Sequence, residues 1–210
     1  YYKDFWKYDP SVLPNGAWTQ VVDFGGTQRG MAVSFVIGNY AYVGTGEDNG
    51  TWPSYKNDFW KYDAISGTWT PIASLPGSIR KGAIAFSVNG YGYVGTGDGG
   101  GPTLLKDFWK YDPGSGSWTS VADMPGPGRK DGFGFSICGR GYAGTGDTVG
   151  VAKAKDFWEY DPAGDTWTQM ADFGVPRSAA AGTSVCSKGY AGTGYDGSYR
   201  KDFWEFDRSA

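Results

Sequence analysis

The sequence contains no histidine, and this absence excludes several kinds of active site. Ser-His-Asp and Cys-His nucleophilic sites, histidine-bound zinc and the usual copper sites all need an imidazole ring. Long apolar runs are also missing, because no stretch approaches the roughly 18 residues of a membrane-spanning helix. No segment has helical periodicity either. We therefore expect no membrane insertion and no chemistry that depends on histidine.

The net charge is also small, at -3, because 19 basic residues nearly balance 22 acidic residues. The basic residues recur along the chain instead of clustering, which argues against a nucleic-acid surface. By contrast, glycine is abundant with 36 residues, and aromatic residues make up 18% of the chain. This combination is typical of tightly turned β-structure. No composition shift divides the chain, so residues 1–210 are expected to form a single domain or a segment of one.

One stretch of eight residues recurs along the whole chain. The stretch KDFWKYDP at 3–10 returns as NDFWKYDA at 57–64, KDFWKYDP at 106–113, KDFWEYDP at 155–162 and KDFWEFDR at 201–208. The spacing defines a repeat unit of about 49 residues. A period of this length is typical of solenoids, propellers and arrays of small units.

Each unit carries four landmarks in the same order. An arginine comes first, followed by an apolar run such as GAIAFSV at 82–88, a turn, and a second run such as YGYVGTG at 91–97. These two runs predict a β-hairpin. The DFW segment predicts a third strand and a Trp-Thr pair a fourth. The arginines are Arg29, Arg80, Arg129 and Arg177, and the Trp-Thr tryptophans are Trp18, Trp69, Trp118 and Trp167.

Four antiparallel strands per unit, stacked unit against unit, predict an all-β protein with the architecture of a β-propeller. Nine of the ten tryptophans occupy two positions of the repeat. Tryptophan buries a large apolar area, so we expect packing between the units, or blades, to stabilise the fold. The recurring aspartates and arginines are interpreted as structural groups that connect loops to strands, because one active site seldom needs the same residue in every unit.

The order of arginine, apolar hairpin ending in glycines, aromatic-Asp strand and tryptophan strand resembles the kelch repeat. The resemblance covers nearly the whole chain and implies a kelch-type β-propeller of four-stranded antiparallel blades. Kelch blades usually end the second strand in Gly-Gly, whereas this sequence has Gly-Thr-Gly. The pattern looks like the kelch variants of bacterial secreted and surface proteins, which implies an extracellular or cell-surface location. The Gly-Thr-Gly segments begin at Gly44, Gly95, Gly144 and Gly192.

The strand types do not occur in equal numbers. There are five DFW strands but four of each other type, so about four repeats are present as three complete blades with a partial blade at each end. One alternative is a closed ring of four blades, which leaves one DFW strand redundant. The other, which we favour, is a segment of a larger ring of about five to seven blades.

The two cysteines, Cys138 and Cys186, hold matching places in successive repeats. A disulfide needs Cα atoms within about 7 Å, and matching positions on neighbouring units usually lie further apart. We therefore expect two free thiols.

An acidic residue closely follows each Gly-Thr-Gly segment. If the second strands run toward one end of the central channel, these carboxylates would form a partial ring suited to calcium, the only cofactor that the sequence suggests. The alternative is that each acid caps its own glycine-rich turn. The four candidates are Glu47, Asp98, Asp147 and Asp196.

The loops between Gly-Thr-Gly and DFW vary from repeat to repeat. They run 11, 9, 9 and 7 residues, and the longest and shortest are rich in aromatic residues. Variable loops on a rigid scaffold commonly bind ligands, and exposed rings suit sugars or a protein partner. Trp52 could instead cover a blade edge. The predicted ligand-binding residues are Trp52, Tyr55, Tyr195 and Tyr199.

These patterns favour a non-catalytic binding scaffold that recognises a protein or a glycan through its loop face. One alternative is an enzyme acting on sugars or peptides with carboxylates such as Glu47 and Asp98. Another is a structural module of a larger extracellular assembly. A deep pocket holding two carboxyl groups, one with a raised pKa, would favour the enzyme, whereas a shallow face with exposed rings would favour binding.

Overall fold

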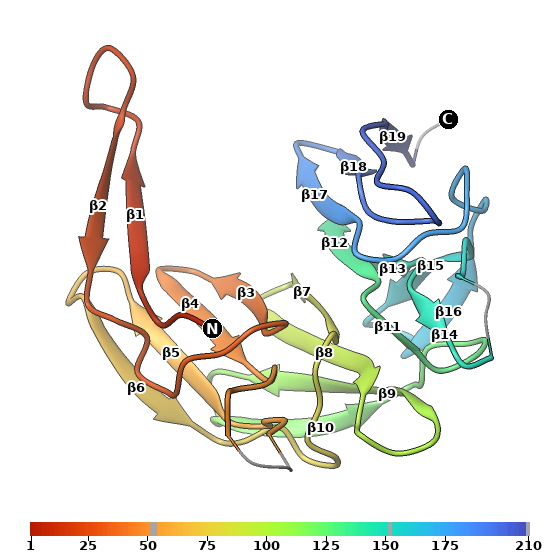
Figure 1. The fold of residues 1–210 in the computed structure, drawn as a ribbon, viewed down its shortest axis with the longest axis horizontal. Helices are drawn as coiled ribbons and strands as arrows, with labels where there is room; N and C mark the ends of the chain where they lie inside the picture. The colour runs from red at the N-terminus through yellow and green to blue at the C-terminus, as the bar shows by residue number, and fades with distance from the viewer. Residues whose placement is uncertain (51–53, 151–152, 209–210) are drawn as a thin grey trace.

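The computed structural model describes residues 1–50, 54–150 and 153–208, and within these ranges all regular structure is β-strand. The described residues include no helix that is long and apolar enough to cross a membrane. The sheets follow one another around an arc, with the N-terminal hairpin at one end and the C-terminal strands at the other (Figure 1). This is the predicted propeller arrangement of antiparallel blades.

Three complete blades of four antiparallel strands lie along the middle of the arc. The first consists of β3 (Val33–Ile37), β4 (Tyr40–Gly44), β5 (Phe59–Asp63) and β6 (Thr68–Ile72). The second consists of β7 (Ile84–Val88), β8 (Tyr91–Asp98), β9 (Leu104–Asp112) and β10 (Ser117–Val121). The third consists of β12 (Phe133–Ile137), β13 (Arg140–Gly144), β15 (Phe157–Asp161) and β16 (Thr166–Gln169). Each blade therefore has the four predicted strand types in order.

A partial blade lies at each end of the arc, as predicted. The N-terminal one is the pair β1 (Phe5–Asp9) and β2 (Ala17–Val21), which are a third and a fourth strand. The C-terminal one is β17 (Ala181–Val185), β18 (Lys188–Gly192) and β19 (Phe203–Asp207), which has a first, second and third strand. A short pair, β11 (Arg129–Lys130) with β14 (Asp147–Thr148), extends the third blade at its loop end.

Backbone hydrogen bonds join the blades at their inner ends. The amide of Gly82 donates to the carbonyl of Met31 at 3.1 Å, and the amide of Asp131 donates to the carbonyl of Gly82 at 2.8 Å. Ala179 continues the series by donating to Asp131 at 2.7 Å. All four residues are left-handed, with φ between 54° and 61°, and each lies two residues after a landmark arginine. The repeat therefore places an unusual backbone conformation where neighbouring blades meet.

The core consists of aromatic rings packed between the blades. Within the second blade, Phe86 stacks on Tyr93 with ring centroids 5.4 Å apart, and Tyr93 contacts Tyr160 of the third blade at 5.3 Å. Gly141 of the third blade leaves room for the ring of Phe86 of the second blade, because a Cβ at position 141 would collide with that ring. Edge-to-face and offset contacts of this kind add to the stabilisation from apolar burial.

The landmark arginines and DFW aspartates form one buried cluster per blade. Arg80 is fully buried and donates to both carboxylate oxygens of Asp107 at 2.8 and 2.7 Å, and to the carbonyl of Thr96 at 3.0 Å. The indole of Trp109 donates to the same aspartate at 2.7 Å. The interpretation of these residues as structural groups is confirmed. Matching pairs are Arg29–Asp58, Arg129–Asp156 and Arg177–Asp202.

Both cysteines lie at the tips of hairpins between first and second strands. Cys138 and Cys186 are exposed, free and left-handed, with φ of 49° and 55°. Turns of this kind need left-handed residues to match the twist of the flanking strands. The expectation of two free thiols is confirmed in this structure.

Candidate functional site

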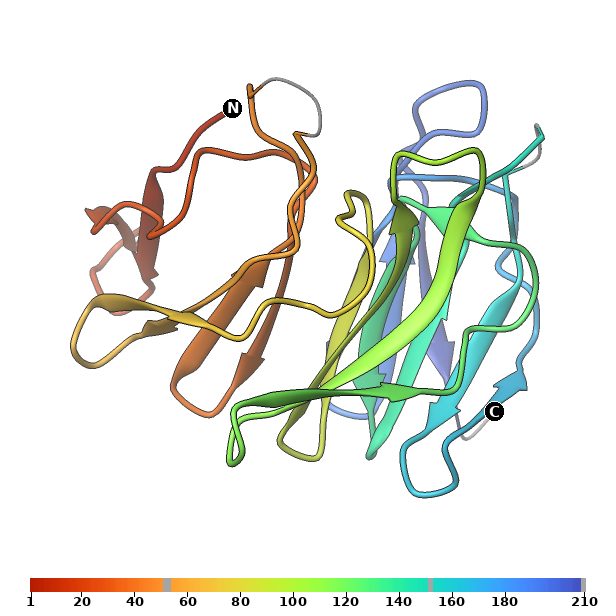
Figure 2. The ribbon, with the colours of Figure 1, turned by 90° about the horizontal axis from the view of Figure 1, so that it is seen from below.

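The connections between second and third strands gather at one end of the blades, at the top of Figure 2. At this loop end, each second strand bends after its Gly-Thr-Gly segment. The bend has a local cause: in the second blade, Thr96 and Gly97 are both left-handed, with φ of 60° and 104°. After the bend, the end of the second strand pairs with the residues that precede the first strand of the same blade. Lys81 pairs with Asp98 in this way, and Ser178 pairs with Tyr195.

The bend brings one residue of each repeat to the same place beside the entry to the first strand. These residues are Glu47, Asp98, Asp147 and Tyr195. Three of the four predicted acidic residues therefore occupy equivalent positions, and the fourth position holds a tyrosine. Asp196 lies one residue further along and bonds Arg200 at 2.7 Å.

Ion pairs cross two of the boundaries between blades at this level. Glu47 accepts from Lys81 of the next blade at 2.8 Å, and Asp98 accepts from Lys130 of the next blade at 3.1 Å. All four of these side chains are less than 30% exposed. The hydrogen bonds from Lys81 and Tyr1 lower the pKa of Glu47. Burial opposes ionisation of Asp98, yet bonds from Gly100 and Lys130 still lower its pKa.

A third ion pair lies at the boundary with the last blade and uses a lysine from a loop. Lys153 donates to Asp147 at 2.6 Å and to the hydroxyl of Ser178 at 2.9 Å. Acids and lysines therefore alternate along the inner loop end. We call the six residues of these three pairs the charged belt; they are Glu47, Lys81, Asp98, Lys130, Asp147 and Lys153.

Tyrosine rings accompany the belt where the predicted aromatic residues lie. The ammonium of Lys81 sits 4.7 Å from the ring centroid of Tyr55, and that of Lys153 sits 5.1 Å from Tyr195. The ring of Tyr199 is 5.3 Å from that of Tyr195 and is 91% exposed. Tyr199 also borders an open hollow of about 610 Å³. Trp52 lies outside the described residues.

The predicted calcium ligands do not converge in the described residues. Each of the four carboxylates has its own lysine or arginine partner. Among the residues that the structure describes, no group of three or more acidic or cysteine side chains is arranged to hold a metal ion. Calcium binding at these positions therefore stays a prediction, and any ion would have to displace an ammonium or guanidinium group first.

The pKa of one carboxyl group at the loop end is shifted in the opposite direction from those of Glu47 and Asp98. Asp131 is half-buried and left-handed, and at the boundary between the second and third blades it packs so closely that a Cβ on Gly82 would lie 2.5 Å from its Oδ1. Burial raises its pKa, and the carboxylates of Asp147 and Asp98 add to the effect, while Lys130 and Lys81 oppose it. The loop end therefore has two belt carboxylates with lowered pKa, Glu47 and Asp98, and one carboxyl group outside the belt, Asp131, with raised pKa.

Sequence reasoning missed the lysines of the belt and Asp131. The contacts of Lys81, Lys130 and Asp131 cross between units, and a repeat alignment compares units without showing which atoms meet at the boundary. One signal was present: Lys81 and Lys130 each follow a landmark arginine, and in each case the preceding unit has an acid after its Gly-Thr-Gly segment. Pairing residues of successive units would have identified two of the three ion pairs.

Comparison with known proteins supports the same fold. A family model described as the Kelch motif matches residues 92–125, which cover most of the second blade. None of the curated proteins matches the sequence. A solved structure titled "Structure of YjhT" superposes with a TM-score of 0.79 at 16% identity, covering 91% of this chain and 66% of that one. The chain thus spans just under two thirds of that protein, carries a kelch motif and has the fold of a kelch-type β-propeller.

Proposed function

We propose that this chain is a non-catalytic binding scaffold that recognises a glycan or a protein through its loop end. The observation that carries the proposal is the charged belt with tyrosine rings beside it, at the end of the blades where the loops differ most. Rigid blades keep these groups in place, so little conformational freedom is lost on binding. Loops on such scaffolds are the usual location of binding residues.

The chemistry of the belt suits a ligand with many hydroxyl or amide groups. Each carboxylate still has free lone pairs and each lysine has further donors, so one ion pair offers both an acceptor and a donor. Tyr195 and Tyr199 present ring faces beside Lys153. A sugar ring or an extended peptide would make both kinds of contact.

The test is to screen the purified chain against a glycan array and a displayed peptide library, and then to measure affinity for the best ligand by calorimetry. Lys81→Met and Tyr195→Ala should each weaken binding by about tenfold or more, which corresponds to about 1.4 kcal/mol. Lys110→Met is the matched control, because its ammonium lies 5.0 Å from the ring of Tyr91 in a similar pair outside the belt. Equal loss in all three variants, or no ligand in either screen, would contradict the proposal.

A second candidate is an enzyme that acts on sugars or peptides, and the raised pKa of Asp131 favours it. A carboxyl group with a raised pKa near others with lowered pKa is the arrangement that general acid catalysis uses. Glu47 and Asp98 are less suited to the acid role, since their pKa values are lowered. Hydrolysis of any member of a chromogenic glycoside or peptide panel, abolished by Asp131→Asn, would establish this alternative.

The proposed location is extracellular or at the cell surface, as the resemblance to secreted and surface kelch proteins implies. A role as a structural module in a larger extracellular assembly is compatible with the same fold. Ligand binding that depends on the belt would distinguish the scaffold from a spacer.

A further inference from the structure

One position of the repeat joins neighbouring blades through its backbone at the inner loop end. It is the left-handed residue that lies two places after each landmark arginine, and it is occupied by Met31, Gly82, Asp131 and Ala179. Asp131 donates from its amide to the carbonyl of Gly82 at 2.8 Å, and its own carbonyl accepts from the amide of Ala179 at 2.7 Å. Neither bond uses the carboxyl group of Asp131.

The other three residues at this position are uncharged. Methionine, glycine and alanine adopt the same left-handed conformation there, with φ of 54°, 61° and 54°. An aspartate is therefore not required for the turn or for the bonds between blades. Asp131 is half-buried, so its carboxyl group loses part of its hydration in the folded chain. A carboxyl group that costs desolvation and that the fold does not need is a candidate for function.

The carboxyl group of Asp131 has no cation of its own. Among the residues that the structure describes, none donates a hydrogen bond to it. Lys130 and Lys81 act on it electrostatically, but both ammonium groups bond to other acids. Lys130 donates to Asp98 at 3.1 Å. Lys81 donates to Glu47 at 2.8 Å. Burial is the largest cause of the raised pKa of Asp131, as expected of a carboxyl group without a partner.

The charged belt cannot supply the missing cation by rearrangement. Its three ion pairs use one lysine each, so with Asp131 four carboxyl groups share three lysines. If Lys130 moved to Asp131, it would leave Asp98 unpaired instead. Rearrangement therefore moves the unpaired carboxylate but does not remove it. When Asp131 is ionised, this group of side chains has one excess negative charge.

The Asp131 side chain lies across the boundary between the second and third blades. A Cβ on Gly82 would lie 2.5 Å from its Oδ1, so the carboxylate occupies the space that a side chain at position 82 would need. Glycine at position 82 thus lets the carboxylate lie against the second blade. Because Asp131 is only half-buried, a ligand group can still reach it from the solvent.

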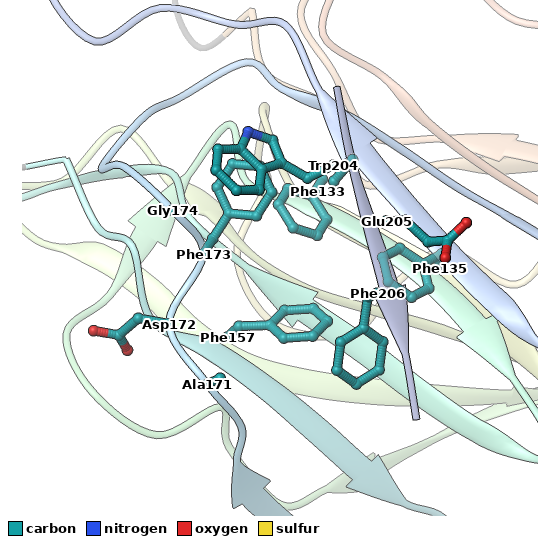
Figure 3. Close-up of a pocket in the computed structure, with 11 residues that line it drawn as sticks. Phe133, Phe135, Phe157, Ala171, Asp172, Phe173, Gly174, Trp204, Glu205 and Phe206 are labelled. Carbon is teal, nitrogen blue, oxygen red and sulfur yellow. The ribbon is translucent and has the colours of Figure 1, made fainter. Parts of the chain in front are cut away.

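Carboxylates beside the apolar pocket between the third blade and β17–β19 have the ordinary arrangement. Figure 3 shows aromatic rings gathered in this pocket, with the carboxylates of Asp172 and Glu205 directed away from the rings. Asp172 pairs with Lys155 at 3.1 Å, and Glu205 pairs with Lys188. These two acids already have cations, whereas Asp131 has none.

The chemistry of the position favours an organic cation over a metal ion. Calcium takes about 6–8 oxygen ligands. In the described part of the chain, no group of three or more acidic or cysteine side chains is arranged to hold a metal ion. A guanidinium group instead matches a single carboxylate with two parallel hydrogen bonds, and it is more weakly hydrated than an ammonium group. The chain itself uses this pairing between Arg80 and Asp107, at 2.8 and 2.7 Å.

We propose that Asp131 binds the guanidinium group of an arginine side chain from a polypeptide ligand. This inference rests on the proposed function of the loop end and specifies its ligand as a protein segment, because a guanidinium group is characteristic of arginine and sugars seldom carry one. The ligand supplies the cation that the loop end lacks. Glu47 and Asp98 keep their lysines, and the remaining donors and acceptors of the charged belt contact the backbone of the bound segment.

The test is a double-mutant cycle between the chain and a peptide. The wild-type chain selects from a displayed library of random peptides, and arginine should be enriched at one position of the selected sequences. The strongest peptide is then synthesised with that arginine and with citrulline, its uncharged analogue. Calorimetry should show at least tenfold weaker binding of the citrulline peptide to the wild-type chain. Asp131→Asn should bind both peptides alike, as weakly as the wild-type chain binds the citrulline peptide.

Two further variants separate a lost contact from a damaged fold. Asp131→Ala should behave like Asp131→Asn, and Ala179 shows that alanine adopts the same backbone conformation at the equivalent position. Asp123→Asn is the matched control, because the side chain of Asp123 is 50% exposed and follows β10, the outermost strand of the second blade. It should keep the tenfold preference for arginine.

The possible failures are distinguishable. Selected peptides without arginine, or an Asp131→Asn chain that still prefers arginine to citrulline, would overturn this inference and leave the binding scaffold in place. Selection of glycans but no peptides would have the same meaning. If the wild-type chain bound neither a peptide nor a glycan, both this inference and the proposed function would be overturned.

Discussion

Residues 3–10 and 106–113 have the same sequence, KDFWKYDP, and their surroundings differ greatly. In the central copy, Phe108 is 0% and Tyr111 is 3% exposed. In the N-terminal copy, the matching Phe5 is half-buried and the matching Tyr8 is 46% exposed. Both segments form β-strands with the same pairing to a fourth strand. The motif therefore encodes a strand and its register, while the neighbours decide how much of it is buried.

The polar part of the motif shows the same contrast. Asp107 accepts two hydrogen bonds from the buried guanidinium of Arg80. Among the described residues, the partner of Asp4 is the indole N–H of Trp6 at 2.6 Å. The difference arises because the arginine comes from the loop before the first strand of the same blade, and the N-terminal sheet consists of β1 and β2 alone. One sequence thus gives a buried ion pair in one place and an exposed carboxylate in the other.

The largest expected effect comes from Asp107→Asn compared with Asp4→Asn. Removing one partner of a buried pair leaves Arg80 as an uncompensated buried charge, so Asp107→Asn should lower the free energy of unfolding by about 3–5 kcal/mol. Asp4→Asn should change it by less than about 0.5 kcal/mol, as expected of an exposed surface residue. Urea unfolding followed by circular dichroism measures both. Equal losses would show that the motif stabilises the chain independently of its neighbours.

A somewhat smaller effect is expected for Trp118→Ala compared with Trp18→Ala. The indole of Trp118 fills a pocket between blades, and its removal should cost about 2–4 kcal/mol, less than full burial because the ring is only half-buried. Trp18 is exposed and should cost about 1 kcal/mol or less. Thermal melts of the two variants give the comparison. A large loss for Trp18→Ala would mean that this ring also occupies a pocket in solution.

The smallest effect is a change in the acid sensitivity of folding. Burial alone would raise the pKa of Asp107, but hydrogen bonds from Arg80 hold it below the ordinary value of 3.8, and Asp58 and Asp156 behave alike. The unfolded chain then binds more protons than the folded one in acid. The stabilisation is complete above about pH 4 and is lost as pH falls through the lower pKa values of the folded state.

The measurement is the urea midpoint between about pH 5 and pH 2. The wild-type chain should lose stability as pH falls, and Asp107→Asn should give a shallower slope because one of the linked carboxyl groups is gone. Lys110→Met, which leaves the three aspartates intact, serves as the control. A slope that is unchanged in Asp107→Asn would show that other groups control acid unfolding.

The candidate site was only partly predictable from the sequence. Glu47, Asp98 and Asp147 were identified because each follows a Gly-Thr-Gly segment, and the structure places all three at equivalent positions. Their lysine partners were not identified, because ion pairs such as Glu47–Lys81 join different units. Tyr195 and Tyr199 were identified from loop composition, and they lie together beside Lys153.

The sequence by itself determined the local structure of this protein. Apolar runs bounded by turn residues specify hairpins, and a recurring order of landmarks specifies blades of one kind, because strand formation and turn chemistry depend on neighbours along the chain. The role of the arginine–aspartate pairs also followed from their recurrence in every unit. These features recur from unit to unit because the residues that form each hairpin and each arginine–aspartate pair lie within one unit.

Only the tertiary structure decided which surfaces meet. The charged belt, the carboxyl group of Asp131 with its raised pKa and the pocket of Trp118 all lie at boundaries between units. Their properties depend on distances and burial across those boundaries, and electrostatic effects change steeply with both. For the same reason one KDFWKYDP segment is buried and the other is exposed, although their residues are identical.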